Sequence, residues 1–425
     1  MTAILIILAL IVIFTILLTK KFNLPRNISL LFITQPLVMC SAPIIVFIGG
    51  LLASELTTNA SLATLPISLM ILGVAAGSIP AAIIAKSKGR RFAVFTGFSC
   101  LLVAALLAVL STKLASFELF TFSSFLFGFG GSFIQQLRFA AIESTDNEDD
   151  IPKVLAILML SGVFAAFLGP EIAVTAKEWL DSPHGYAGSF LLLALFIVLA
   201  AFIMLFFKEP EIKEVSSKGE ARSLSTIAKQ PIFIIAISTA TIGFALMSYL
   251  MTATPLSMHH MQGHSLNDTK WVIQSHIAAM YLPSLMTPWL VKKIALKGLL
   301  ILGSIIYIAV ALIAFSGQEV IHYWWALILL GIGWNFLFLT GTSLLPQSYK
   351  ASERHKVQAT NDFVLFGFQA FASLMAGWIL FTGGWNWVVL TSLPFIVALF
   401  IVNAVYFRYK NKQQVQANIT LTGVK

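Results

Sequence analysis

Charged residues are unusually scarce in this sequence. Asp, Glu, Lys and Arg make up only 11% of the 425 residues, whereas hydrophobic residues make up 58%. A soluble domain of ordinary composition is about one quarter charged. The mean hydropathy of +0.90 therefore excludes an ordinary soluble fold. It predicts an integral membrane protein that is embedded in the lipid bilayer.

Cysteines are also scarce, and phosphate-binding glycine loops are absent. The two cysteines, Cys40 and Cys100, lie inside hydrophobic runs, which excludes a disulfide framework and a cysteine metal site. No Walker-type loop occurs, so we expect no ATP chemistry and no cofactor. The net charge of +9 is spread over short loops between hydrophobic runs, so nucleic acid is not an expected partner.

Twelve hydrophobic runs are long enough to span a bilayer, which takes about 20 residues. They lie near 28–53, 64–86, 92–112, 117–140, 152–176, 187–207, 231–254, 269–291, 298–316, 321–346, 357–381 and 386–408. A charged stretch separates the first six from the last six. The sequence therefore predicts an all-α membrane protein with six-helix bundles at 28–207 and 231–408, a linker at 208–230 and a tail at 409–425.

Lysine and arginine are strongly biased towards one side of this topology. With the loop "AKSKGRR" (85–91) in the cytoplasm, 24 of the 27 basic residues fall on that side or at that end of a span. Only Lys113, Lys177 and Lys270 fall outside. Cytoplasmic loops of membrane proteins have this excess of positive charge. We therefore expect a multi-pass protein of the cell inner (plasma) membrane, with its linker and C-terminus in the cytoplasm.

The first 19 residues, "MTAILIILALIVIFTILLT", form a further hydrophobic run. A cleaved signal peptide has positive charge before its hydrophobic core, but here Lys20 and Lys21 follow the core. We interpret 1–19 as an extra transmembrane helix with a periplasmic N-terminus. It contains few small or polar residues, which favours a peripheral position facing lipid.

The two halves of the sequence repeat one another. The stretch "LFGFGGSF" at 126–133 matches "LLGIGWNF" at 329–336 with an offset of 203, and the runs that begin near 28 and 231 have the same offset. This repeat indicates a duplicated six-helix unit. Transporters built from parallel repeats bind substrate at the repeat interface, near the membrane midplane.

Three motifs resemble those of the major facilitator superfamily, and the resemblance covers residues 28–408. The loop "AIIAKSKGRR" is similar to the family's inner loop, with Gly89, Arg90 and Arg91 matching and Lys86 in place of an aspartate. The stretches "SFLFGFGGSF" and "GVFAAFLGPEIA" match the motifs of the fourth and fifth spans in part. The resemblance implies two six-helix bundles in pseudo-two-fold relation, with helices 1, 4, 7 and 10 around a central site.

A narrower resemblance concerns the solute. The stretches "MHHMQGHSL", "VIQSHIAAMYLPS", "GIGWNFLFLTGTSLL" and "VQATNDFVLFGFQAFAS" look like a bacterial branch of this superfamily. That branch includes proposed riboflavin-uptake and siderophore-related carriers. The resemblance implies a small organic substrate, such as a siderophore, a vitamin like riboflavin, or a drug-like compound.

Arg138, Glu171 and Asp362 are charged residues inside predicted spans, where charge is costly and tends to face the bundle interior. Arg138 shares a helix face with Gln135, so it either binds an anionic or carbonyl group of the substrate or reaches headgroups and water. Asp362 is either a proton-coupling site or half of an ion pair at the inner gate. Glu171 follows a Gly-Pro pair that can kink the helix, so it either takes up a proton or lies in an outer vestibule.

Polar and aromatic residues near mid-membrane are further candidate substrate contacts. Trp334 offers a stacking surface and one hydrogen-bond donor, with Asn335 beside it. His276 on the eighth span is either a contact or a structural residue. The predicted substrate-binding residues are Gln35, Gln135, Arg138, Gln274, His276, Trp334 and Asn335.

The loop after the second span predicts a gate with its charges exchanged. In the superfamily, the aspartate of this loop helps to close the inner gate near the start of helix 11. Here the loop has a lysine, and Asp362 lies on the eleventh span. We therefore predict that Lys86, Arg90 or Arg91 pairs with Asp362, or with neighbouring backbone, in the outward-facing state. Arg138 is the alternative partner.

These features predict a monomeric secondary active transporter, not an enzyme, that moves a small-molecule substrate by alternating access. We expect a proton gradient to drive transport. The few titratable residues inside the spans lie where they can bind and release the coupled proton. Two alternatives stay open: a transporter-like sensor, and a membrane metalloenzyme that uses His259, His260 and His264 of an outer loop. Capping or gating of that loop is the other role for these histidines.

Overall fold

The structure is a computed structural model that describes residues 1–145, 151–209 and 222–422. Within these ranges the chain forms helices and no strand, which confirms the all-α architecture. Helices satisfy every backbone hydrogen bond within the segment, as a bilayer core requires. Eleven of the described helical segments are long and apolar enough to cross a membrane.

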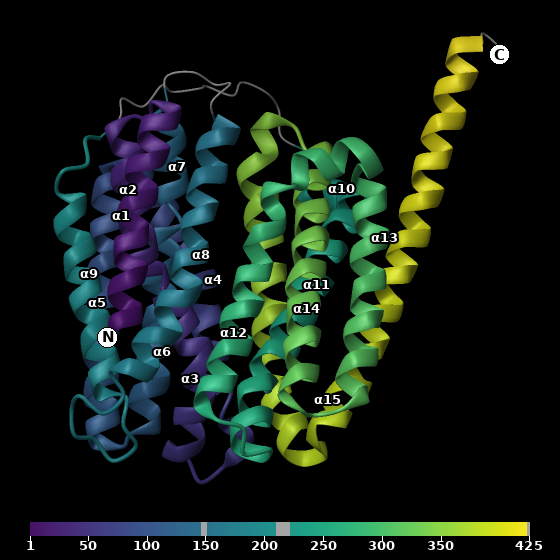
Figure 1. Ribbon diagram of the computed structural model, residues 1–425. Coiled ribbons are helices and arrows are strands. Elements are labelled where there is room, and N and C mark those ends of the chain that lie inside the picture. The colour runs from purple at the N-terminus through teal and green to yellow at the C-terminus, as the bar shows by residue number, and fades with distance from the viewer. Residues whose placement is uncertain (146–150, 210–221, 423–425) are drawn as a thin grey trace.

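The first half of the chain is drawn from purple to blue-teal in Figure 1. Its helices are α1 (Thr2–Phe22), α2 (Arg26–Met39), α3 (Ser41–Leu56), the short η1 (Ala60–Leu62), α4 (Leu65–Lys88), α5 (Arg90–Leu114), α6 (Phe117–Ile134), α7 (Leu137–Glu143), α8 (Ile151–Thr175) and α9 (Ala187–Met204).

The second half is drawn from teal to yellow. Its helices are α10 (Leu224–Ala228), α11 (Pro231–Pro255), η3 (Leu256–Met261), α12 (Leu266–Tyr281), η4 (Leu282–Leu285), α13 (Thr287–Ser316), α14 (Val320–Leu344), η5 (Leu345–Ser348), η6 (Ala351–Glu353) and α15 (Arg354–Thr422).

The two halves stand side by side (Figure 1) and meet mainly through two helix pairs. Helix α4 of the first half packs on α15, and α8 packs on α12. The bundle has two ends, called the linker end and the far end. The linker end holds the α4–α5 turn at Gly89, residues 208–209, α10, η6 and the C-terminus. The far end holds η1, η3 and the turn at Gly384.

Several predicted spans differ in detail from the helices. The first span is broken into α2 and α3 at Cys40, because Pro43 has no N–H with which to continue the α2 ladder. The fourth is broken into α6 and α7 at residues 135–136. The eleventh and twelfth run together in α15 and are separated only by a turn at Gly384, whose φ of 78° suits glycine.

The eighth span is the most irregular. Helix α12 has only 16 residues, and the span continues through η4 into the start of α13. The turn to the ninth span falls at Ala295, which has non-helical φ and ψ angles inside α13. The sequence placed the end of this span at 291, so the break at Tyr281 was not anticipated.

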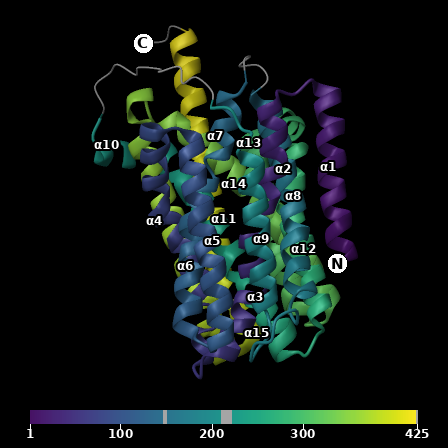
Figure 2. The same cartoon turned by 90° about the vertical axis from the view of Figure 1, so that its left-hand side faces the viewer.

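Helix α1 lies at the edge of the first half, where it contacts α8 and α2 (Figure 2). Thr19 and Ser29 share a hydrogen bond of 2.7 Å between their hydroxyl oxygens, and the rings of Phe14 and Phe164 are 5.6 Å apart. The opposite side of α1 exposes large apolar side chains such as Leu5 and Leu17. This is the peripheral position that its composition favoured.

Candidate functional site

Opposite charges face one another between the halves, towards the linker end. Arg138 begins α7, just past the α6–α7 break, and its guanidinium lies 4.8 Å from the centre of the Phe139 ring. Its electrostatic partner is Asp362 of α15. Asp362 also accepts a hydrogen bond of 3.1 Å from the Asn361 amide. The described residues Arg138 and Asp362 therefore lie near one another across the halves without forming a direct salt bridge, and their pairing in an outward-facing state stays a prediction.

The helix face that presents Arg138 opens onto free space. Gln135 and Arg138 are both exposed although they lie within a membrane span. Gly131, four residues before Gln135 and so on the same face, has open space beside it: an added Cβ would meet nothing within 4 Å. A polar face with free space beside it is suited to a solvated ligand path.

An aromatic cluster lies in the second half. The Trp334 and Phe338 rings of α14 stack with a 4° interplanar angle and a centroid distance of 5.2 Å. Phe244 of α11 meets Trp334 edge-on at 4.9 Å and lies 6.4 Å from Phe366 of α15. Trp334 is buried, and its indole N–H has no hydrogen-bond partner within the described residues. Sequence analysis identified Trp334 but missed the three phenylalanines, because Phe is abundant in every span.

Asn335 has different neighbours from Trp334. Its amide donates to the Met280 carbonyl at 2.8 Å and to the Ser284 hydroxyl at 2.6 Å. Both acceptors lie at the α12–η4 break, where backbone carbonyls lose their helical partners. The geometry thus gives Asn335 a structural role at this break, whereas the sequence grouped it with the substrate contacts.

Three other candidate contacts are bound to backbone carbonyls. Buried His276 pairs its Nδ1 with the Leu327 carbonyl at 2.7 Å, which is the structural role weighed for it. Gln35 donates to Leu158 of α8 at 3.3 Å within the first half. Gln274 donates across the halves to the Phe167 carbonyl at 3.0 Å.

Polar contacts between the halves gather at the far end. Lys270 of α12 donates to the Glu171 carboxylate of α8 at 2.8 Å, close to the Gln274 contact. On the other helix pair, the Thr64 hydroxyl donates to the Leu374 carbonyl at 3.2 Å. Glu171, expected to be free for proton uptake or in a vestibule, thus has a basic partner that the sequence did not indicate. That partner lies 99 positions away in the chain.

The basic loop at the linker end contacts its own half. The Arg90 guanidinium binds Glu143 at 2.8 Å. Glu209 accepts the backbone N–H groups of Arg90 and Arg91, which start α5. A carboxylate at a helix N-terminus is stabilising there. Lys86 is exposed. Arg90 and Arg91 therefore have partners that sequence analysis did not foresee, and pairing with Asp362 in an outward-facing state stays a prediction.

The end of the linker is attached to the second half through Glu353. Arg222 donates to both carboxylate oxygens of Glu353, at 2.7 Å and 2.8 Å, and also to the Ser348 carbonyl. The Glu353 side chain is fully buried. The guanidinium hydrogen bonds hold the pKa of Glu353 well below its usual range, and the pKa of Arg222 is raised by the same contact.

The histidines expected near the outer loop take part in loop hydrogen bonds. His259 Nδ1 lies 2.7 Å from the His264 carbonyl, and His264 Nε2 lies 2.8 Å from the Gln318 carbonyl. No cluster of three metal-ligating residues occurs in the part of the chain that the structure describes. These hydrogen bonds connect the outer loop to itself and to the segment just before α14.

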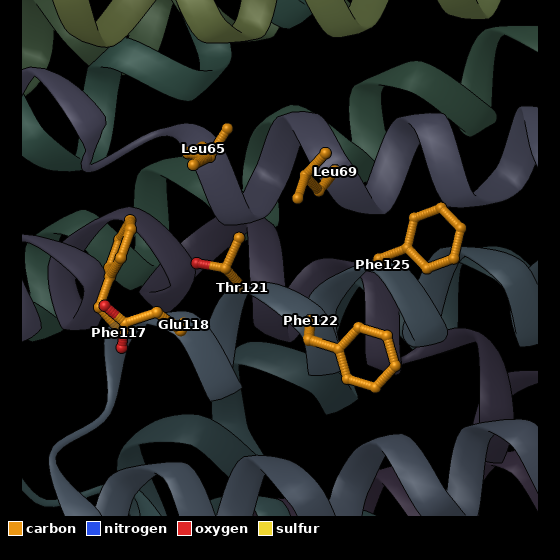
Figure 3. Close-up of a pocket in the computed structure, with 7 residues that line it drawn as sticks. All are labelled: Leu65, Leu69, Phe117, Glu118, Thr121, Phe122 and Phe125. Atoms are coloured by element: carbon orange, nitrogen blue, oxygen red, sulfur yellow. The ribbon is translucent and has the colours of Figure 1, made fainter.

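A groove of about 500 Å³ lies between α4 and α6 near the far end (Figure 3). It is lined by Leu65, Leu69, Phe117, Glu118, Thr121, Phe122 and Phe125. Glu118 accepts from the Ser116 hydroxyl, which caps α6. The groove belongs to one half and is almost wholly apolar, so it fits lipid better than a solute passing between the halves.

Opposite charges between two helical halves and an aromatic cluster within the second half are typical of a multi-pass membrane transporter. The chain belongs to the Major Facilitator Superfamily, whose family model matches residues 30–368. This confirms the resemblance and its fold of two six-helix bundles. Members of this family are transporters, so the chain is not an enzyme.

The chain is similar to two transporters and to a solved homologue of a third. The chain is 35% identical to the riboflavin transporter RfnT of Brucella anthropi, over 89% of this chain and 94% of that one. It is 27% identical to the uncharacterized transporter YddS of Bacillus subtilis, over 86% and 87% of the two chains. A solved bacterial homologue of the lysosomal transporter Spinster, inward-facing and unoccupied, matches 90% of this chain and 95% of its own, with a TM-score of 0.65 and 14% identity.

Proposed function

We propose that the chain is a secondary active transporter that moves riboflavin, or a closely related flat organic solute, across the inner membrane. The observation behind this proposal is the 35% identity with a riboflavin transporter over 89% of the chain. The aromatic cluster around Trp334 supports it, because flat aromatic ligands stack on such rings.

In this proposal the linker end faces the cytoplasm and the N-terminus faces the periplasm. The bias of lysine and arginine supports this orientation. The two bundles at 28–207 and 231–408 then move as units about a central site, and one monomer is a complete carrier. The described polar contacts between the halves favour a state closed at the far end and open towards the cytoplasm.

The proposed cycle gives defined parts to Trp334, Gln135, Arg138 and Asp362. Trp334 and its phenylalanine neighbours stack the ring system, while Gln135 and Arg138 bind its polar groups in the space beside Gly131. Asp362 is the proton-coupling carboxylate, because it is partly buried and faces Arg138. Proton binding and the Arg138 interaction then compete for the same carboxylate.

Transport of labelled riboflavin into proteoliposomes tests this proposal. We expect accumulation that rises when an imposed pH gradient is acid on the far-end side. Asp362→Asn is expected to abolish gradient-driven accumulation while keeping exchange of internal for external riboflavin. Absence of riboflavin flux in the parent protein would refute the substrate, and an unaltered gradient response in Asp362→Asn would refute the coupling role.

A tryptophan pair tests the stacking site. Trp334→Ala is expected to raise the half-saturating riboflavin concentration by about tenfold, because an aromatic contact is lost. Trp378→Ala is the matched control, since Trp378 is 53% exposed and has no ring contact with the aromatic cluster among the described residues. Equal effects of the two substitutions would contradict a stacking role for Trp334.

A further inference from the structure

Helices α8 and α12 form a polar ladder between the halves. Glu171 contacts Lys270 at 2.8 Å, and the Phe167 carbonyl contacts Gln274 at 3.0 Å. Phe167 and Glu171 are one turn apart on α8, as Lys270 and Gln274 are on α12, so each pair lies on one helix face. The helices run in opposite directions, so both steps of the ladder are in register.

A proline lies just after the carbonyl that accepts the cross-half bond. Pro170 has no N–H, so the Ala166 carbonyl, next to that of Phe167, lacks its helical donor in α8. Gln274 from the other half donates to the Phe167 carbonyl. Gly169 holds α8 close to the α2–α3 junction, because an added Cβ would lie 2.7 Å from the Cys40 carbonyl oxygen.

The ion pair of this ladder is largely shielded from solvent. The Lys270 and Glu171 side chains are 16% and 17% exposed. A shielded charge that loses its partner is destabilising, so removal of either side chain weakens the closed arrangement. Gln274 adds a neutral hydrogen bond, which contributes less than a charged one.

We propose that Glu171, Lys270 and Gln274 form a latch that holds the far end shut and must open once in every transport cycle. The inference rests on the alternating access of the proposed function, but not on the identity of the solute. It gives Glu171 and Gln274 one shared role in gating. It also adds Lys270, which no sequence motif marked, and it places the latch beside Pro170 of α8.

Labelling of a single cysteine from the far-end side tests the latch. The reporter is Gly131→Cys, placed where a side chain has free space, in a protein with Cys40→Ala and Cys100→Ala. Whole cells are treated with a maleimide that does not cross the membrane. In the parent protein the closed far end keeps this labelling slow. Glu171→Gln and Lys270→Gln are each expected to speed labelling by about tenfold, the usual contribution of a charge-assisted hydrogen bond.

Two further variants separate the latch from a general loss of structure. Exchanging the charges with Glu171→Lys and Lys270→Glu restores the ion pair, so labelling is expected to return towards the parent rate. Lys177→Gln is the matched control, since the described contacts of Lys177 stay within one half: its Nζ lies 3.8 Å from Glu178 and 4.9 Å from the centre of the Tyr186 ring. It removes the same charge and is expected to leave labelling unchanged.

Each result has a defined meaning. Unchanged labelling in both single variants overturns the latch, and so does a charge-exchanged variant that labels as fast as they do. Fast labelling of the parent reporter from outside would instead contradict the proposed orientation or closed state. Labelling needs no riboflavin, so failure of the latch is distinguishable from failure of the substrate assignment. Size-exclusion profiles of the purified variants identify any that have not folded.

Discussion

At the scale of single residues, charged side chains were easier to identify than their partners. Arg138, Glu171 and Asp362 stand out in the sequence because charge inside a span is costly. Their partners depend on packing between distant segments, so Lys270 could not be assigned to Glu171 from spacing. The same reason hides Phe244, Phe338 and Phe366, whose residue type is too common to be informative.

Asn335 shows a second limit of residue-level reasoning. Its position beside Trp334 suggested a shared substrate role. In the structure the Asn335 side chain lies at the α12–η4 break, where its amide donates a hydrogen bond to the Met280 carbonyl. Pro283 marks that break in the sequence, but the side chain that bonds the Met280 carbonyl comes from a distant helix and could not be anticipated.

Glu353 gives a residue-scale prediction about pH. Its pKa is lowered in the folded protein by the Arg222 hydrogen bonds, so its stabilising effect is present at neutral pH. That effect is lost only when the pH falls through the lowered folded-state pKa. Glu353→Gln is therefore expected to lower the thermal midpoint at about pH 7 and also at about pH 5.

The control for Glu353 is Glu319→Gln, which changes an exposed carboxylate at the start of α14 that makes no side-chain cap. Its midpoint is expected to match the parent at both pH values. Thermal unfolding of purified protein in detergent gives the comparison. A midpoint for Glu353→Gln equal to that of the parent at neutral pH would show that the Arg222 contact does not stabilise the fold.

At the scale of elements, close helix packing depends on particular glycines. Helices α4 and α6 approach so closely that a Cβ added at Gly128 would overlap the Met70 carbonyl oxygen, and one at Gly73 would overlap that of Phe125. Small residues permit such contacts between membrane helices. The sequence repeat marked the glycines of α6, but it did not reveal which of them face α4.

Gly128→Ala is expected to destabilise the protein by about 1–3 kcal/mol, because the backbones of α4 and α6 must move apart. Gly131→Ala is a matched control three residues away, since its Cβ would meet nothing within 4 Å. This control should be neutral or stabilising by up to about 1 kcal/mol through helix propensity. Chemical denaturation of both variants measures the difference, and equal stabilities would refute the packing argument.

At the scale of the whole molecule, α1 is separable from the carrier fold. The matched family region begins at residue 30, and α1 contacts only α8 and α2 among the larger described interfaces. We expect a protein lacking residues 2–22 to keep its fold and its riboflavin flux. Uptake and thermal midpoint report the outcome. A collapse of both would assign α1 a part in assembling the first half.

The all-α membrane fold and the family followed from hydrophobic length and local motifs. Hydrophobic length is a local property, and so it is visible in sequence. The arrangement of the halves is not local. It depends on contacts such as Thr64 with Leu374, which are separated by 310 positions, and the same sequence must support more than one such arrangement in a carrier.

The far-end contacts between α8 and α12 have a consequence for the kinetics of uptake. In a carrier that rests with these contacts formed, every net import cycle includes the return of the empty protein, and that return must break the Glu171–Lys270 pair without help from bound solute. During exchange of internal for external riboflavin, the protein carries bound solute in both directions, so the empty protein need not return. Preloading vesicles with unlabelled riboflavin should therefore accelerate entry of the labelled vitamin, and the acceleration should shrink when Lys270 is replaced by glutamine.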